Sequence, residues 1–175
     1  MIKTLVAIAL VLSGVANSAN AGAGEVPPQP TTNQIDANVN ALVNAQVRVL
    51  SKAASFCAAD HQPQGHSLDS SLKSYVEAFS TGTKAGMIEI AKTDKDILRP
   101  TPAYKGKEFE MMDRQGDLLL KRVQASPATE CMKLGSFLDS GTTATFKEST
   151  VQGHREYKAK RAEYCARLPK PTNCD

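Results

Sequence analysis

The sequence predicts an all-α protein: an up-and-down bundle of four to five helices with two disulfides, preceded by a cleaved signal peptide. Three observations favour this fold class. Apolar residues recur at gaps of three and four over several long segments, which is the spacing of one helix face. No segment alternates apolar and polar residues over the length of a strand. The four cysteines are an even number, which is typical of paired half-cystines in an exported chain.

The N-terminus has the three parts of a secretory signal peptide. Lys3 supplies the positive charge, and the run from Thr4 to Leu12 is apolar. Ala19 and Ala21 place small side chains at the two positions that a signal peptidase reads, so we expect cleavage after Ala21, or else after residue 23. The alternative is a membrane anchor, but the apolar run is far shorter than the roughly 20 residues that span a bilayer. The predicted location is periplasmic or secreted.

The rest of the chain is expected to form one domain. Residues 1–21 are assigned to the signal peptide, the Gly- and Pro-rich residues 22–32 to a flexible lead-in, and residues 33–175 to a single helical domain. Loss of Lys3 leaves 20 basic residues against 18 acidic ones, and this near balance argues against binding to nucleic acid. The mature chain contains no stretch that reads as a transmembrane segment.

The first helix is expected to begin near Thr32 or Asn33, since either side chain can cap it. The segment from Asp60 to Gly65 contains a proline and ends it. Between these limits the apolar residues form one wide face. The positions on this face are Ile35, Val39, Leu42, Val43, Val47, Val49, Leu50, Ala53, Ala54, Phe56 and Cys57.

Ser67 is a plausible cap for a second helix, in which Gly82 and Gly86 either permit close packing or mark a bend. Its apolar stripe is Leu68, Leu72, Tyr75, Val76, Phe79, Met87 and Ile90. Two prolines preclude regular helix over residues 94–106, and a third helix follows. Its inward positions are Phe109, Met112, Gly116, Leu119 and Val123.

Ser126 and Pro127 predict the start of a short fourth helix that carries Cys131, Leu134 and Leu138. A last helix is expected to begin at Thr145, because Thr145 and Glu148 match the capping-box pattern, and to continue to about Leu168. The less polar side of this last helix is Phe146, His154, Tyr157, Tyr164 and Cys165.

The antiparallel arrangement favours one pairing of the cysteines. Cys57 and Cys131 each lie about one turn from the same end of the bundle, and the Pro-containing tail can return Cys174 to Cys165. We therefore expect the disulfides Cys57–Cys131 and Cys165–Cys174, with the other two connectivities still open. No Cys-x-x-Cys pair is present, which argues against a zinc site.

Histidines are the candidate ligands for a divalent metal. His61 and His66 lie in one interhelical loop with Asp60 and Asp69 nearby, and imidazole suits such an ion. The alternative is an exposed polar turn, because four side chains on a flexible loop rarely form a preorganised site.

His154 lies beside Tyr157 in the segment HREY of the last helix. Here the sequence resembles the haem-binding four-helix b-type cytochromes, in which a histidine near the C-terminal end ligates iron. The resemblance implies a haem with His154 as a ligand. That family also uses a methionine near the start of its first helix, and residues 32–59 contain none. The possible substitutes are Met87, Met111 and Met112, although methionines at helical spacing commonly fill a core.

Two segments are candidates for binding another protein. The long loop 94–106 offers the apolar residues Ile97, Leu98 and Tyr104, which either form a contact surface or fold back on the end of the bundle. The last helix carries the main basic concentration of the chain, which fits an acidic partner or anionic lipid. The candidate contact residues in it are Arg155, Lys158 and Arg161. The alternative for this helix is a solvated face with local ion pairs.

The chain contains no nucleophile-elbow, zinc-protease or phosphate-loop motif, so nothing in it points to an enzyme. The function predicted by elimination is an exported, non-catalytic helical protein that binds an unidentified periplasmic or extracellular protein. An inhibitor, an immunity-type antagonist or an assembly accessory would each fit. No cofactor is required by this reading. The alternative is a haem- or metal-binding helical bundle.

Overall fold

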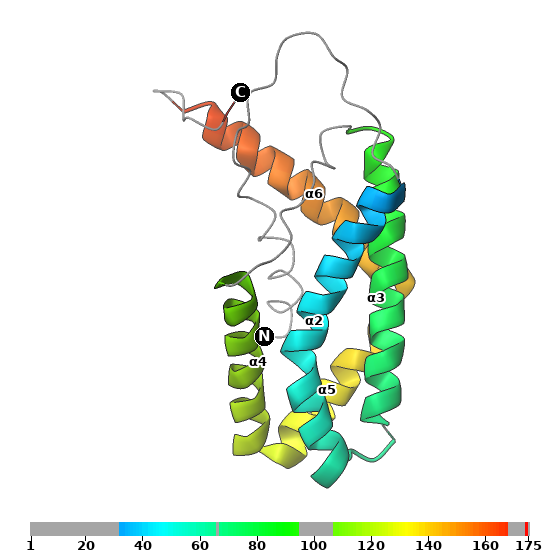
Figure 1. Cartoon of the computed structure of the whole chain (residues 1–175), viewed down its shortest axis with the longest axis vertical. Coiled ribbons are helices and arrows are strands. Elements are labelled where there is room, and N and C mark those ends of the chain that lie inside the picture. Colours follow the sequence, from blue (N-terminus) through cyan, green and yellow to red (C-terminus); the bar gives the residue numbers. More distant parts are fainter. Residues whose placement is uncertain (1–31, 66, 95–106, 168–173, 175) are drawn as a thin grey trace.

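A computed structural model describes residues 32–65, 67–94, 107–167 and 174 of the chain (Figure 1). These residues form five helices and no strand, which confirms the all-α class. The helices are α2 (Thr32–Asp60), α3 (Leu68–Ala91), α4 (Lys107–Ala125), α5 (Pro127–Asp139) and α6 (Thr143–Cys165). The expected signal peptide, the lead-in and residues 95–106 of the long loop lie outside the described residues.

Helix α2 is the centre of the bundle. It packs against α3 on one side and α4 on the other, while α5 contacts one end of α2, α3 and α4 (Figure 1). Helix α6 packs on α3 and crosses it at an angle. Helices that follow one another in sequence are therefore not always neighbours, because α2 lies between α3 and α4.

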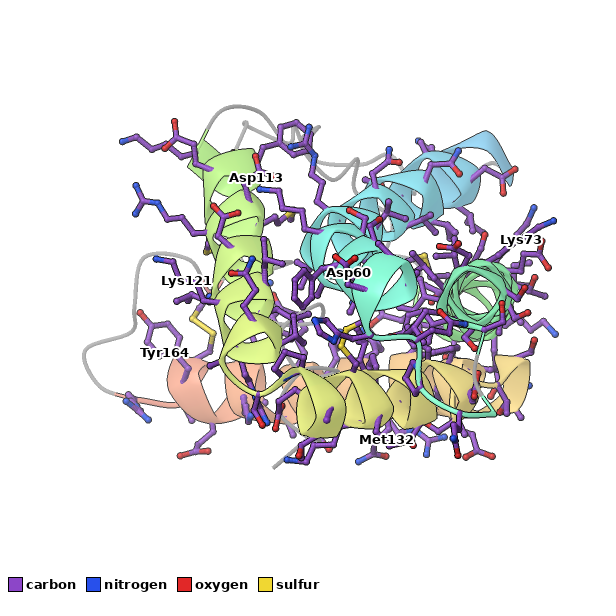
Figure 2. All side chains as sticks on the ribbon, turned by 90° about the horizontal axis from the view of Figure 1, so that it is seen from below. Asp60, Lys73, Asp113, Lys121, Met132 and Tyr164 are labelled. Carbon is purple, nitrogen blue, oxygen red and sulfur yellow. A yellow bond between two sulfur atoms is a disulfide. The ribbon has the colours of Figure 1, made fainter. Side chains whose placement is uncertain are left out.

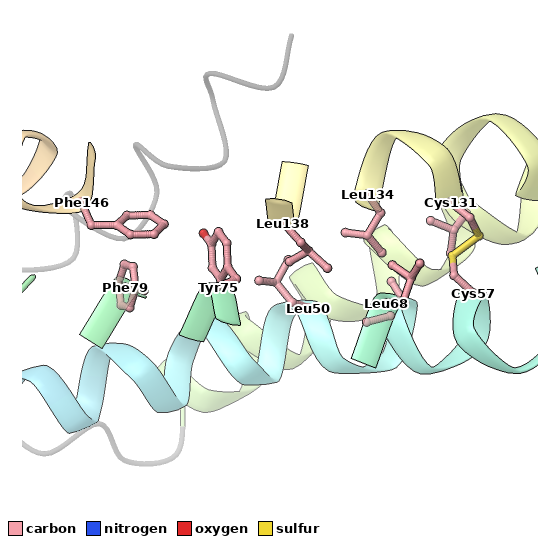
Figure 3. Close-up of a cluster of buried hydrophobic side chains, with 12 residues drawn as sticks. Leu50, Cys57, Leu68, Tyr75, Phe79, Cys131, Leu134, Leu138 and Phe146 are labelled. Atoms are coloured by element: carbon pink, nitrogen blue, oxygen red, sulfur yellow. A yellow bond between two sulfur atoms is a disulfide. The ribbon is translucent and has the colours of Figure 1, made fainter. Parts of the chain in front are cut away.

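The main core follows the apolar stripes that the sequence predicts. Leu50 of α2, Leu68 of α3 and Leu138 of α5 are nearly inaccessible to solvent and belong to one cluster (Figure 3). The rings of Tyr75 and Phe146 meet edge-on at 5.1 Å between centroids, which is a favourable geometry for aromatic pairs. The contacts of the Phe146 ring with Tyr75 and Phe79 join the start of α6 to α3.

The two disulfides have the expected pairing. Cys57 and Cys131 join the end of α2 to the start of α5, with a Cα–Cα distance of 5.5 Å and no exposed surface (Figure 3). Cys165 is bonded to Cys174 at the end of α6, nine residues away in sequence. The agreement arises because α2 and α4 end at the same end of the bundle (Figure 1). Cys57, near the end of α2, therefore lies level with Cys131, near the start of α5.

The helices begin close to the predicted positions, but the capping hydrogen bonds differ from the prediction. Ser67 and Ser126 precede α3 and α5 as expected, and neither side chain makes a capping hydrogen bond. The capping box of the last helix is formed by Thr142 and Thr145, so α6 begins at Thr143 instead of Thr145. The Thr142 hydroxyl accepts from the Thr145 backbone N–H, and the Thr145 hydroxyl accepts from the Thr142 N–H. A threonine hydroxyl thus fills the role that the pattern assigns to Glu148.

Burial of Tyr75 predicts a loss of stability at alkaline pH. Burial raises the pKa of Tyr75 to about 12. The unfolded chain releases this proton near pH 10. The contribution of the protonated Tyr75 side chain to the free energy of unfolding is therefore intact below pH 10, and it is lost as the pH rises through about 12. We expect Tyr75→Phe to remove about 1 kcal/mol of the decline in the free energy of unfolding between about pH 9 and about pH 11 in urea titrations. An unchanged decline in Tyr75→Phe would contradict this assignment.

Candidate functional site on the last helix

The first half of α6 is held tightly against α3. Phe146 and Thr150 are its buried residues, and they face Gly82 and Gly86 of α3. A Cβ at Gly82 would lie 2.7 Å from the Phe146 Cβ, and one at Gly86 would lie 2.7 Å from the Thr150 Cβ. The two glycines therefore permit a close approach of the helices, which is one of the two roles that the sequence left open.

Three polar contacts extend the attachment along α6. The Lys147 ammonium pairs with Glu89 at 2.6 Å and holds the pKa of that carboxyl below its ordinary value. Beyond the end of α3, the Asp94 carboxylate contacts His154 Nε2 at 3.0 Å and Lys158 Nζ at 2.9 Å. The side chains of His154 and Asp94 are only 16% exposed. The contact between them is therefore partly buried, and it is the last such ion pair along α6 in the described residues.

Beyond His154 the helix leaves the bundle. Every residue from Arg155 to Tyr164 is exposed, and Figure 1 shows this part of α6 extending past α2 and α3. We call residues 155–167 the distal arm. Five of its side chains are basic and two are acidic: Arg155, Lys158, Lys160, Arg161 and Arg167 against Glu156 and Glu163. The distal arm is therefore a basic helical segment whose side chains contribute little to the core of the bundle.

One face of the distal arm combines tyrosine with arginine. Tyr157, Arg161 and Tyr164 follow at steps of four and three, so they lie on one side of the helix. Arg161 Nη1 donates to the Tyr157 hydroxyl at 3.3 Å, and the Arg167 guanidinium lies 5.9 Å from the Tyr164 ring centroid. Tyr157 is 39% exposed and Tyr164 is 47% exposed. Large aromatic surface is thus presented to solvent with the cations around it.

The predicted contact residues have different positions. Arg155, Lys158 and Arg161 are brought together on the distal arm, with Lys158 also paired to Asp94. Ile97, Leu98 and Tyr104 lie outside the described residues. Sequence periodicity places Tyr157 and Tyr164 on the less polar side of the helix together with Phe146, but the structure exposes both tyrosines while Phe146 is buried. The signal that the arm leaves the bundle is the scarcity of aliphatic residues after Val151.

The candidate metal ligands are not assembled in the described part of the chain. His61 is exposed beside the Phe56 ring before the start of α3, whereas His154 contacts Asp94 beyond its end. They therefore lie near opposite ends of α3, whose 24 residues span about 36 Å. His66 lies outside the described residues, and no group of three His, Cys, Asp or Glu side chains within residues 32–65, 67–94 and 107–167 could hold a metal.

The chain matches no protein-family model, no curated protein and no solved structure. Among the described helices, none has the length and apolar character needed to cross a membrane. The site geometry is therefore the basis for a functional proposal.

Proposed function

We propose that this is an exported, non-catalytic protein that binds another protein through the distal arm of α6. The location is supported by the signal-peptide-like N-terminus and by two disulfides, which persist in oxidising compartments. One observation carries the proposal: every residue from Arg155 to Tyr164 is exposed. This part of the helix is held in place at both ends, by the ion pair of Lys158 with Asp94 and by the disulfide Cys165–Cys174.

Such an arm is well suited to recognition. Short helices gain little stability by themselves in water, so ordering one beforehand lowers the entropy lost when a partner binds. Tyrosine and arginine are the residue types that most often dominate protein–protein binding energy, and the distal arm presents both. Among the described residues, Arg155 and Lys160 form no ion pair. The partner surface is therefore expected to be acidic. This protein would then act on its partner as an inhibitor, an immunity-type antagonist or an assembly accessory.

Affinity capture of a partner tests this proposal. The exported protein is immobilised and exposed to the envelope fraction of its own source cells, and the captured protein is then titrated in solution. We expect Tyr157→Ala combined with Tyr164→Ala to weaken its binding by about 100-fold, since each anchor residue contributes of order tenfold or more. Arg155→Glu combined with Lys160→Glu should weaken it by about tenfold and reduce its salt dependence.

Lys73→Glu is the matched control for charge, because Lys73 is exposed on α3, on the side away from the distal arm (Figure 2). None of these substitutions is expected to change the melting temperature by more than about 2 °C, since all the altered side chains are exposed. Partner binding that is unaffected by both double variants would refute the distal arm as the contact surface.

A further inference from the structure

Helix α4 uses one side to pack and leaves the opposite side to solvent. Met112, Gly116 and Val123 are buried against the bundle. A Cβ at Gly116 would lie 2.8 Å from the Arg48 carbonyl oxygen, so the backbones of α4 and α2 approach closely here. Next to this seam, two acidic side chains of α4 face α2. Asp113 pairs with Arg48 at 3.0 Å and Asp117 pairs with Lys52 at 2.5 Å.

The outward side of α4 carries a regular stripe of cationic and apolar residues. Steps of four, three, four and three residues place its five members on one narrow line along the helix, directly opposite the buried side. We call this set the α4 outer stripe: Lys107, Met111, Arg114, Leu118 and Lys121. All five residues are exposed, and Leu118, at 59%, is the most exposed large apolar side chain among the described residues.

The charges of the stripe are uncompensated by its own helix. Asp113 and Asp117 are engaged by α2, and the three cations of the stripe form no ion pair among the described residues. Two exposed acids, Glu108 and Glu110, lie beside the N-terminal end of the stripe, and Glu110 lines an open depression with Lys107, Met111 and Arg114. The result is a basic ridge with two apolar side chains placed between the cations.

We propose that the α4 outer stripe docks the protein on an anionic phospholipid surface. Lys and Arg stems can lie along the headgroup region with their charges on lipid phosphates, while Met111 and Leu118 enter the boundary of the acyl region. A lipid surface deforms around a convex ridge, whereas a folded partner would need a matching groove. Attachment of this kind lays the helix along the surface and is distinct from spanning the bilayer.

The arrangement of the molecule is compatible with this docking. Lys121 on α4 and Tyr164 on the distal arm point to the same side, and Lys73 on α3 points to the opposite side (Figure 2). A surface bound through the stripe would therefore leave α3 facing away from the lipid. The proposal does not depend on the partner-binding function of the distal arm, because the two surfaces belong to different helices.

Sedimentation with vesicles tests the inference on the full exported chain. The vesicles contain phosphatidylcholine alone or an equal mixture of phosphatidylcholine and phosphatidylglycerol. We expect binding to the mixed vesicles only, weakened by added salt. Lys121→Glu should reduce this binding about tenfold and Leu118→Ser about fivefold, because one removes an electrostatic contact and the other removes buried apolar area.

The matched controls make the same chemical changes elsewhere on the surface. Lys73→Glu reverses an exposed lysine on α3, and Ile88→Ser removes an apolar side chain that is 41% exposed. Both are expected to bind the mixed vesicles like the wild type. Absence of binding by the wild type, equal binding to the neutral vesicles, or equal losses in the control variants would each overturn the proposal. Binding to the mixed vesicles that is lost with Arg155→Glu/Lys160→Glu but kept with Lys121→Glu would also overturn it, by assigning lipid contact to the distal arm.

Discussion

Replacement of both Cys57 and Cys131 by serine is expected to lower the free energy of unfolding by about 4 kcal/mol and the melting temperature by about 10 °C or more. The bond joins residues 74 positions apart, so its removal releases a long segment of the unfolded chain from a constraint. Both half-cystines are fully buried in the main core, so the variant also places two hydroxyl groups among apolar side chains (Figure 3). Thermal and urea unfolding followed by circular dichroism measure the loss.

The second disulfide provides the control for this prediction. Cys165 and Cys174 close a short segment at the end of an exposed arm, so Cys165→Ser with Cys174→Ser should change global stability by less than about 1 kcal/mol. Amide hydrogen exchange over residues 155–165 should increase, because the arm can then fray without unfolding the bundle. Equal losses of stability in the two double variants would show that the arm is part of the cooperative unit.

The inward faces of the helices could be predicted from sequence because each depends on spacing within a single segment. Leu68, Tyr75 and Phe79 repeat at the period of a helix, and all three are buried in the structure. The same holds for Cys131, Leu134 and Leu138 in the fourth helix. One disulfide follows from this regularity, since the helix lengths then fix the level of Cys57 and Cys131.

The pairing of helices could not be predicted in this way. The apolar stripe of α4 shows which side is buried but not against which neighbour, and α4 lies on α2 with Gly116 against the Arg48 backbone. The contacts of Asp94 with His154 and Lys158 join residues about 60 positions apart, which no local pattern connects. Tyrosine is equally suited to a half-buried face and to an exposed one, so periodicity did not indicate that Tyr157 is exposed.

The glycines of α3 set the position of α6, and their replacement tests this directly. Gly82 faces the Thr143 carbonyl oxygen and the Phe146 Cβ, and Gly86 faces Thr150. A Cβ at Gly86 would also lie 3.0 Å from the Lys147 carbonyl oxygen. A methyl group at either position has no space unless the backbone of α6 shifts. Overpacking of this kind typically costs 1–3 kcal/mol, whereas the gain from alanine in a helix interior is about 1 kcal/mol.

We therefore expect Gly82→Ala combined with Gly86→Ala to lower the free energy of unfolding by about 3 kcal/mol. Thr81→Ala is the control, because Thr81 is an exposed neighbour on α3 and alanine there should leave stability unchanged or raise it by about 0.5 kcal/mol. Displacement of α6 should also separate His154 from Asp94, since both contacts of Asp94 depend on the crossing that the glycines permit. The His154 imidazole signals in NMR spectra would then shift in the double alanine variant. A gain of stability in that variant, with the His154 signals unchanged, would mean that α6 does not rest on these two glycines.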